Sequence, residues 1–307
     1  MAKSELRKHY FLEHYVVIAP ARDQRPEVFY PRAKAHKVED PKCPFDNNNE
    51  KIIWQHPKGN EPRVKVIGNI YPAFTTDNPD AYGRQELVID TMNHDEEFSD
   101  LSTEHIVEIF QAYRDRLTVL AKMDGIRYVL AFKNDGPLAG ASVAHAHSQI
   151  FALPIVPPQI AADSDALNHY WEYHDSCAYC DIIKWEVTQK VRIIAQDKHF
   201  IAIAPYASSH GFEAWVLPRR HMSKFAELHV GELESLAVIM KKLTARLDAS
   251  MISFNFFLQE SLDVQDHHFI LKLAPRTFEH AGAELGTGII INPVAPEFAA
   301  LWYNGKA

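Results

Sequence analysis

The sequence predicts an α+β fold built from two halves, 1–160 and 161–307, that are related by an internal duplication. The first observation is that a cysteine-containing turn, strand-like segments, a histidine, a helix and a second histidine follow one another in the same order in each half. The second is that one helix with a regular apolar stripe stands out in each half. The third is that the strand-like segments are too few and too irregularly connected for a doubly wound sheet. We therefore expect each half to form an antiparallel sheet with one packed helix.

The composition disfavours several classes of protein. With 47% hydrophobic and 23% charged residues, the 307-residue chain is typical of globular proteins. Its net charge of −8 and pI near 6.1 argue against DNA or RNA as a partner but permit a small phosphate ligand. The first fifteen residues carry charges where a signal peptide needs an apolar core, and no apolar run has the length of a membrane span. We therefore expect a cytoplasmic protein that does not enter a membrane.

In the first half, strand-like segments surround one helix. Ser102 is a suitable N-cap for this helix, which is predicted to run to about Met123. Its apolar stripe consists of Ile106, Ile109, Phe110, Tyr113, Leu117 and Leu120. The strand-like segments cover residues 63–74, 85–94, 127–135 and 145–154.

The second half repeats this order. Its helix is predicted from apolar residues at the same spacing, namely Leu233, Leu236, Met240, Leu243 and Leu247. Its strand-like segments cover residues 192–206, 213–221, 254–261 and 267–276.

The duplication arranges residues of metal-ligand type into two ordered sets. The second-half set is a CxxC pair with two histidines, Cys177, Cys180, His221 and His268. This set completes a tetrahedral zinc site with no open position, so we expect structural zinc there; a buried thiol pair is the alternative. The first-half set is Cys43, Asp46, His94 and His145, in which an aspartate stands where the second cysteine would be. Because its thiolate count is lower, this set is expected to bind zinc more weakly or to have lost the metal.

One strand carries a candidate catalytic histidine. His145, His147 and Gln149 alternate, so in an extended strand they share one face. The duplication matches His145 with His268 but matches His147 with Ile270, so only the first half has the second histidine. If His145 faces a metal, the neutral imidazole of His147 is available as a nucleophile toward phosphorus. A carbonyl or carboxylate on its other nitrogen would fix the tautomer, and Gln149 could donate to a phosphate oxygen.

The loop before this strand has the composition of a phosphate-binding loop. It supplies two glycines and short polar side chains between Asn134 and Ser142, whose backbone N–H groups could surround a phosphate; a plain surface turn would look similar. A different interpretation makes His145 and His147 two ligands of one catalytic metal. That interpretation is disfavoured because His145 already has partners matched by the duplication and no nearby carboxylate completes a second set.

Eight motifs lie along nearly the whole chain: APARDQRP (19–26), CPFD (43–46), NIYPAF (69–74), FKNDGPLAGAS (132–142), HAHSQIFALP (145–154), CAYCDII (177–183), LPRRH (217–221) and AGAELGTGIIINPV (281–294). In this order they resemble the galactose-1-phosphate uridylyltransferase branch of the histidine-triad superfamily, which includes ADP-glucose phosphorylase-like and diadenosine tetraphosphate phosphorylase-like enzymes. The resemblance implies two histidine-triad-like halves, zinc in the scaffold, a homodimer and a role in galactose metabolism. Three departures stand out: Ala146 replaces a usual proline, Asp46 replaces a cysteine, and Ile270 stands where many relatives have histidine. Ser148, where classical members more often have glycine, favours the ADP-sugar phosphorylase side.

The resemblance implies that His147 attacks the α-phosphorus of a nucleotide sugar and carries the nucleoside monophosphate covalently. Sugar 1-phosphate then leaves, and a second phosphate acceptor takes the nucleotide. By position, Gln149 and Ser142 would contact the transferred phosphoryl group. The nucleotide would be held by Arg22, Arg25, Asn69 and Asn134, and the sugar or acceptor by Glu284, Gly286 and Thr287.

Two other functions use the same residues. In a phosphorylase or hydrolase, acting on an ADP-sugar or a dinucleoside polyphosphate, orthophosphate or water would replace the sugar phosphate as acceptor. The other is a catalytically silent, zinc-stabilised nucleotide-binding protein. The sequence does not decide the base, the sugar or the acceptor.

Overall fold

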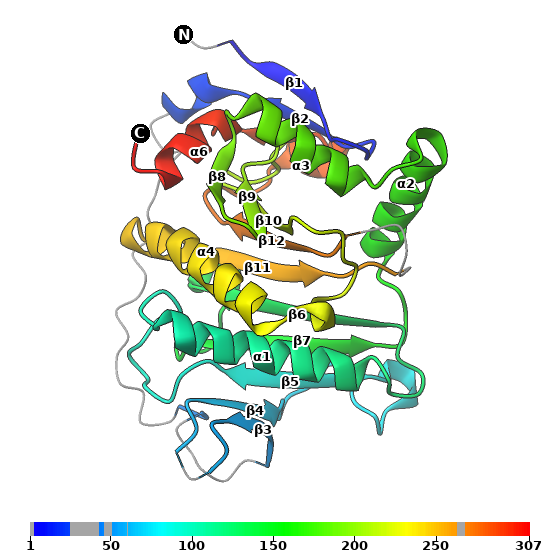
Figure 1. Cartoon of the computed structure of the whole chain (residues 1–307), viewed down its shortest axis with the longest axis vertical. Coiled ribbons are helices and arrows are strands. Elements are labelled where there is room, and N and C mark those ends of the chain that lie inside the picture. Colours follow the sequence, from blue (N-terminus) through cyan, green and yellow to red (C-terminus); the bar gives the residue numbers. More distant parts are fainter. Residues whose placement is uncertain (1–2, 25–42, 46–50, 60, 263–267) are drawn as a thin grey trace.

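The computed structural model describes residues 3–24, 43–45, 51–59, 61–262 and 268–307, and ten of its strands form one sheet (Figure 1). The strand order is β3-β4-β5-β7-β6-β11-β12-β10-β9-β8, and every neighbouring pair is antiparallel. The strands of the first half are β3 Ile52–His56, β4 Val64–Gly68, β5 Arg84–Ile89, β6 Tyr128–Asp135 and β7 His147–Leu153. Those of the second half are β8 Ile193–Gln196, β9 Phe200–Ile203, β10 Ala214–Pro218, β11 Phe254–Gln259 and β12 Ile270–Pro275.

The order of these strands shows the predicted duplication. Reading inward from either edge, β3, β4, β5, β7 and β6 mirror β8, β9, β10, β12 and β11. The halves meet where β6 pairs with β11, from Phe132 opposite Phe257 to Asp135 opposite Phe254. The two expected sheets are therefore one continuous sheet, because pairing between β6 and β11 leaves neither half with an open inner edge.

Both predicted helices are present and pack against each other over one face of the sheet (Figure 1). The first, α1 (Thr103–Leu120), starts at Ser102, whose side chain accepts a hydrogen bond from the His105 N–H, and ends three residues before the predicted Met123. The second, α4, covers Val230–Ala249. Their apolar stripes share one core with the facing strand residues, so each fully buried leucine or phenylalanine contributes about 1.5–3 kcal/mol of hydrophobic free energy.

The opposite face is covered differently in the two halves. In the second half, two helices that the sequence did not predict, α2 (Pro158–His174) and α3 (Ala178–Gln189), pack on β9, β10 and β12. In the first half, the described residues that pack on this face are a small cluster around Cys43, Phe45 and Val143. Among the described residues the duplication is therefore asymmetric, because fewer of them cover this face in the first half than in the second.

A small second sheet brings the N-terminal segment to the second half. It consists of β1 (Glu5–Lys8), β2 (Tyr15–Ile18) and β13 (Ile290–Asn292), with β13 parallel to β2. The short helix α5 (Gly282–Thr287) precedes β13, and α6 (Pro296–Tyr303) follows it. Among the described helices, none is long and apolar enough to cross a bilayer.

Candidate active site

His147 is the first residue of β7, and its ring is hydrogen-bonded to the backbone two residues earlier. The prediction that His145 lies on the same strand is wrong: β7 starts at His147, because residues 141–146 form an irregular segment before the ladder. The Nδ1 atom of His147 lies 2.9 Å from the backbone oxygen of His145. A carbonyl can only accept, so Nδ1 carries the hydrogen of a neutral ring and the lone pair is on Nε2. This is the tautomer that a nucleophilic Nε2 requires.

The surroundings of His147 favour its neutral form. Burial lowers the pKa of His147, and the positive charge of Lys133 lowers it further, against a smaller opposing effect of the His145 carbonyl. The His147 side chain is 6% exposed, and its ring lies 5.1 Å from the ring of Phe45, centroid to centroid. At pH 7 the imidazole is therefore uncharged and has an available lone pair.

A cavity of about 190 Å³ adjoins this imidazole. Of the predicted phosphoryl and nucleotide contacts, Ser142 and Asn134 line it together with His147. Gly136, with φ of 83°, starts the loop on one side of the cavity, and the short helix η3 (Pro137–Ala139) follows. Residues 141–147 complete the lining of the cavity. The loop predicted to bind phosphate thus lies against the candidate nucleophile.

The other predicted substrate contacts lie outside this cavity. Gln149 is on β7, two residues beyond His147, and does not line it. Asn69 follows β4, and its side chain accepts a hydrogen bond from the Tyr71 N–H. The backbone N–H of Asn69 donates to the Gln85 carbonyl at 3.2 Å, and Gln85 is opposite Phe151, so Asn69 lies toward the Phe151 end of β7.

The remaining predicted contacts lie on the N-terminal and C-terminal segments. Arg22 is in the short helix η1 (Pro20–Gln24) after β2. Glu284, Gly286 and Thr287 belong to α5 before β13, and the Glu284 carboxylate caps this helix by accepting from the Ala281 N–H. Arg25 lies outside the described residues.

Three of the four residues in the first-half metal set lie close together in the structure. The ligand atoms of Cys43, His94 and His145 all lie within 4.8 Å of one another, and Cys43 Sγ is 3.6 Å from His145 Nδ1. His145 Nε2 donates to the Thr91 carbonyl at 2.8 Å, which directs Nδ1 toward the set. Asp46 lies outside the described residues. The described donors suit a metal that accepts one sulfur and two nitrogens.

The second-half set is complete. The ligand atoms of Cys177, Cys180, His221 and His268 lie within 4.8 Å of one another. Cys180 Sγ is 3.5 Å from His221 Nδ1 and 3.2 Å from His268 Nε2. The ligand–ligand edges of a tetrahedral zinc site are about 3.4–3.8 Å, given Zn–N and Zn–S bonds of about 2.1 and 2.3 Å. The set therefore fits tetrahedral zinc after small adjustments.

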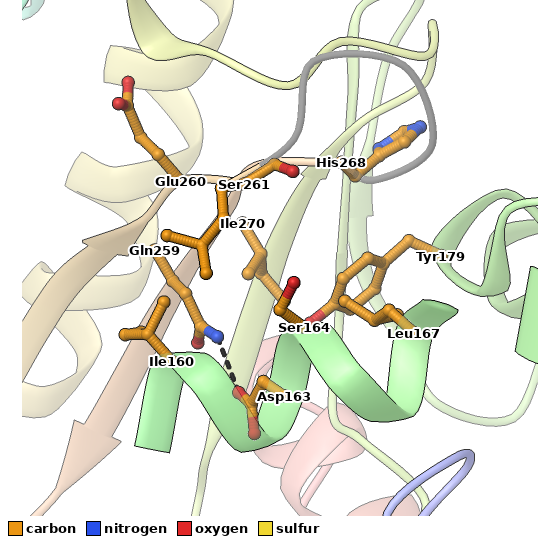
Figure 2. A pocket seen from close by; sticks show the side chains of 11 residues that line it. Ile160, Asp163, Ser164, Leu167, Tyr179, Gln259, Glu260, Ser261, His268 and Ile270 are labelled. Carbon is orange, nitrogen blue, oxygen red and sulfur yellow. Dashed lines mark hydrogen bonds between the residues drawn. The ribbon is translucent and has the colours of Figure 1, made fainter. Parts of the chain in front are cut away.

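The second-half counterpart of the cavity beside His147 is nearly filled by the described residues. The matching space holds only about 10 Å³, and Figure 2 shows side chains of α2 and α3 gathered against Ile270 and His268. Asp163 on α2 accepts a hydrogen bond from Gln259, and it lies 3.7 Å from Lys272 Nζ. Since the position matched to His147 is Ile270 and no ligand-sized space adjoins it, the second half has no equivalent centre among the described residues.

One buried group near His147 was not predicted from the sequence. Lys133, on β6, is 1% exposed, and its ammonium group contacts Asp90. Burial alone would lower the pKa of Lys133, but Asp90 and Asp135 outweigh this effect and raise it, so the side chain stays charged. Lys133 lies in the FKND motif that the sequence analysis noted, yet a strand lysine normally faces solvent, and only the tertiary structure shows its burial.

Known proteins match both halves of the chain. Residues 54–157 match the model of the galactose-1-phosphate uridyl transferase N-terminal domain, and residues 163–258 match that of the C-terminal domain. ADP-glucose phosphorylase from Arabidopsis thaliana is 31% identical over 96% of this chain and 91% of its own length. Galactose-1-phosphate uridylyltransferase from Thermotoga maritima is 25% identical over 96% of both chains.

Solved structures agree with these matches. The crystal structure of Arabidopsis ADP-glucose phosphorylase with bound ADP-glucose superposes with a TM-score of 0.86 at 29% identity, covering 98% of both chains. A uridylyltransferase structure covers 99% of this chain and 98% of its own, with a TM-score of 0.78 and 25% identity. The chain therefore belongs to the galactose-1-phosphate uridyl transferase family of nucleotidyltransferases.

Proposed function

We propose that the enzyme transfers a nucleoside monophosphate from a nucleotide sugar to a phosphate acceptor through a covalent adduct on His147. The observation that carries this proposal is the neutral, oriented imidazole beside the cavity, with Nδ1 bonded to the His145 carbonyl at 2.9 Å. The Nε2 lone pair forms an N–P bond to the α-phosphorus. The P–O bond to the sugar 1-phosphate breaks, and its electron pair leaves on the departing oxygen. An acceptor phosphate oxygen then attacks the same phosphorus and displaces the imidazole.

The protein stabilises the charge that develops in this reaction. As the N–P bond forms, the imidazole becomes positive, and the His145 carbonyl stabilises the Nδ1–H that remains. Ser142, which lines the cavity, can donate its hydroxyl to a phosphoryl oxygen, and Gln149 would do so from the next outward-facing position of β7. Asn134 Oδ1 accepts from Asn255 Nδ2 at 2.9 Å, an interaction that orients this amide at the edge of the cavity.

Within this reaction class, an ADP-sugar as donor and orthophosphate as acceptor are the substrates we favour. The matched relative at 31% identity and the superposed structure with TM-score 0.86 are both ADP-glucose phosphorylases. Ser148 supports the same choice, because the resemblance associates serine at this position with that side of the family. A UDP-hexose with a hexose 1-phosphate acceptor is the second candidate, supported by the uridylyltransferases that also match.

We propose structural zinc at the second-half set. Burial lowers the pKa of His268 to about 3, so this ring is a neutral ligand at pH 7. Bound zinc would be tetrahedral and closed to substrate, and these four residues would join α3, β10 and β12. The first-half set would orient His145, and thereby the carbonyl that holds His147. On this basis 1–160 is the catalytic half and 161–307 the metal-stabilised half.

A homodimer in the cytoplasm completes the proposal. Arg22 and the α5 residues belong to the N-terminal and C-terminal segments that pack on the second half, whereas the cavity is lined by first-half residues. A second copy could bring Arg22, Arg25, Glu284, Gly286 and Thr287 to this cavity, as the resemblance implies for contacts with nucleotide and sugar. Sedimentation of the purified protein tests this assembly.

Intact-protein mass spectrometry tests the proposed function. The wild-type protein is incubated separately with ADP-glucose, UDP-glucose and a dinucleoside polyphosphate, and the donor that leaves one nucleoside monophosphate on the protein identifies the base. His147→Ala should show no gain, whereas His174→Ala, at the end of α2, should retain it. No gain in the wild-type protein with any donor would favour a silent binding protein. Turnover that survives His147→Ala but stops with a chelator would favour a catalytic metal.

A further inference from the structure

A buried polar cluster fixes the backbone on both sides of the candidate nucleophile. Lys133 Nζ donates to the His147 carbonyl at 3.0 Å and to Asp90 Oδ2 at 2.9 Å. The Asp90 backbone N–H donates to the Ala146 carbonyl at 3.1 Å, and its carboxylate accepts from Ser148 Oγ at 3.0 and 3.2 Å. Three consecutive residues, 146 to 148, are thus held by Lys133 and Asp90, which are at most 1% exposed.

Lys133 takes the place of a missing strand partner. The ladder between β6 and β7 ends at Phe132 opposite Gln149, two residues before His147. Beyond that pair the two strands separate, and the loop that begins at Gly136 lines the cavity between them. A buried carbonyl without a partner costs about 1–3 kcal/mol, and the Lys133 ammonium group removes this cost while the strands stay apart.

The second half provides an internal comparison for this cluster. Sheet register matches Lys133 with Leu258 and Ser148 with Leu271, and these two leucines are opposite each other on β11 and β12. There the ladder continues to Gln259 opposite Ile270, the residue matched to His147. The strand positions that match Val88 with Val216 also match Asp90 with Pro218. The half without the histidine therefore has no charge at any of the three positions, and its strands stay paired.

The comparison shows that the closed ladder of the second half does not need this cluster. Replacing a buried ion pair with well-packed apolar residues is often neutral or stabilising, and the second half shows that this fold accepts leucines at two of these positions. Lys133 and Asp90 occur only in the half whose strands separate, so the general stability of the fold does not explain their presence. The explanation that fits the contacts is that an open strand end with a fixed imidazole requires a buried donor.

We propose that Lys133, together with Asp90 and Ser148, is a positioning unit that keeps β6 and β7 apart at His147 and fixes the direction of its imidazole. This inference rests on the proposed role of His147 as nucleophile. Lys133 is among the residues that line the cavity, but its ammonium group is bonded to Asp90 and to the His147 carbonyl, so we assign it a positioning role and not a catalytic one. It acts through the His147 carbonyl, and Asp90 acts through Lys133, Ser148 and the Ala146 carbonyl.

The test removes the Lys133–Asp90 ion pair and leaves the Asp135 carboxylate, which is 4% exposed and 3.9 Å from Lys133 Nζ, in place. Asp90→Asn combined with Lys133→Met should lower the melting temperature by several degrees, because the His147 carbonyl loses its donor at a cost of about 1–3 kcal/mol. The single-turnover rate of adduct formation should fall further than this loss of stability explains, by about 10- to 100-fold, since a 1 Å misplacement of reacting groups can cost that much. The KM for the donor should change less than threefold, because the Lys133 ammonium group is engaged with Asp90 and the His147 carbonyl and is not available to the donor. The matched control is Glu186→Gln with Arg192→Met, which removes a buried pair of the second half, 3.1 Å apart, and should leave the rate unchanged.

A second measurement reports on the imidazole itself. In histidine labelled with ¹⁵N, the wild-type protein should show one fixed Nδ1–H signal for His147, assigned by its absence in His147→Ala, and the double variant should show a broadened or shifted one. A wild-type rate and an unchanged signal in the double variant would overturn the inference. If the wild-type protein forms no adduct, the proposed function fails, and the NMR comparison alone decides whether the cluster positions the ring. If the double variant does not fold, Ser148→Ala decides: it should slow adduct formation severalfold, and a wild-type rate would contradict the proposal.

Discussion

Gly136 has a backbone conformation that only glycine adopts readily, and replacing it should damage the candidate site. Its φ is 83° and its ψ is 165°, where a side chain costs about 1–3 kcal/mol. A Cβ atom at Gly136 would also lie 2.4 Å from Ser253 Oγ and 3.3 Å from Ser253 Cα. Overpacking of this kind costs about 1–3 kcal/mol, so Gly136→Ala should cost about 2–6 kcal/mol in total.

Gly140, in the same loop, provides the matched comparison. It has φ of 81° and ψ of 22°, and a Cβ atom there would meet no atom within 4 Å. Gly140→Ala should therefore cost only about 1–2 kcal/mol, the ordinary penalty of a left-handed residue. The difference between the two variants comes from Ser253 and from the more restricted backbone angles of Gly136.

Thermal unfolding and steady-state kinetics measure both consequences. For a domain of this size, each kcal/mol lowers the melting temperature by about 2–4 °C, so Gly136→Ala should unfold several degrees below Gly140→Ala. Because Gly136 lines the cavity beside His147, displacement of the loop should also lower kcat/KM tenfold or more. Adding Ser253→Ala should recover part of the loss, since the nearest contact then becomes 3.0 Å. Equal melting temperatures and equal kcat/KM for the two glycine variants would refute the reasoning.

Three further predictions address the scaffold. Cys180→Ser should lower the zinc content of the purified protein, measured by mass spectrometry of the metal, and its melting temperature; unchanged zinc content would contradict the assigned site. Arg116→Met should cost about 3–5 kcal/mol in urea unfolding, because it leaves the fully buried Glu86 carboxylate with Arg84 as its remaining cation, and adding Glu86→Gln should recover most of that loss. Ser102→Ala should cost about 1 kcal/mol by removing the α1 cap and leave kcat/KM unchanged; a loss of activity without a loss of stability would show that the helix end has another role.

The parts of the fold that the sequence predicts are those with a local signal. The helices α1 and α4 repeat leucines, isoleucines and phenylalanines every three to four residues because one face of each lies against the sheet. In α2, by contrast, the buried residues include Asp163 and Ser164, so no apolar stripe is present to reveal the helix. The pairing of β6 with β11 joins segments more than a hundred residues apart and has no local signal at all.

The candidate site divides in the same way. Spacing and duplication were sufficient to group the candidate metal ligands that the structure describes, all but Asp46, because each group repeats a pattern of chemically distinctive side chains. They were insufficient for Lys133 and Asp90, since a lysine in a strand-like segment and an aspartate after one usually face solvent. The direction of the His147 ring was expected to depend on a carbonyl or carboxylate, but only the structure identifies this group as the backbone oxygen of His145.

The asymmetry between the halves explains why one chain has one candidate centre. In the second half, α2 and α3 cover the sheet face, the ladder continues to Ile270, and the ligand atoms of four candidate metal ligands lie within 4.8 Å of one another. In the first half, the equivalent strands separate two residues earlier and leave a cavity beside a histidine. A closed ladder and an open cavity cannot occur at the same strand positions. Paired strands leave no room for a phosphate, and separated strands leave backbone groups without their ladder partners. Duplication can provide both, because one copy keeps the closed ladder while the other, under the proposed function, is kept open by Lys133 and presents the imidazole of His147.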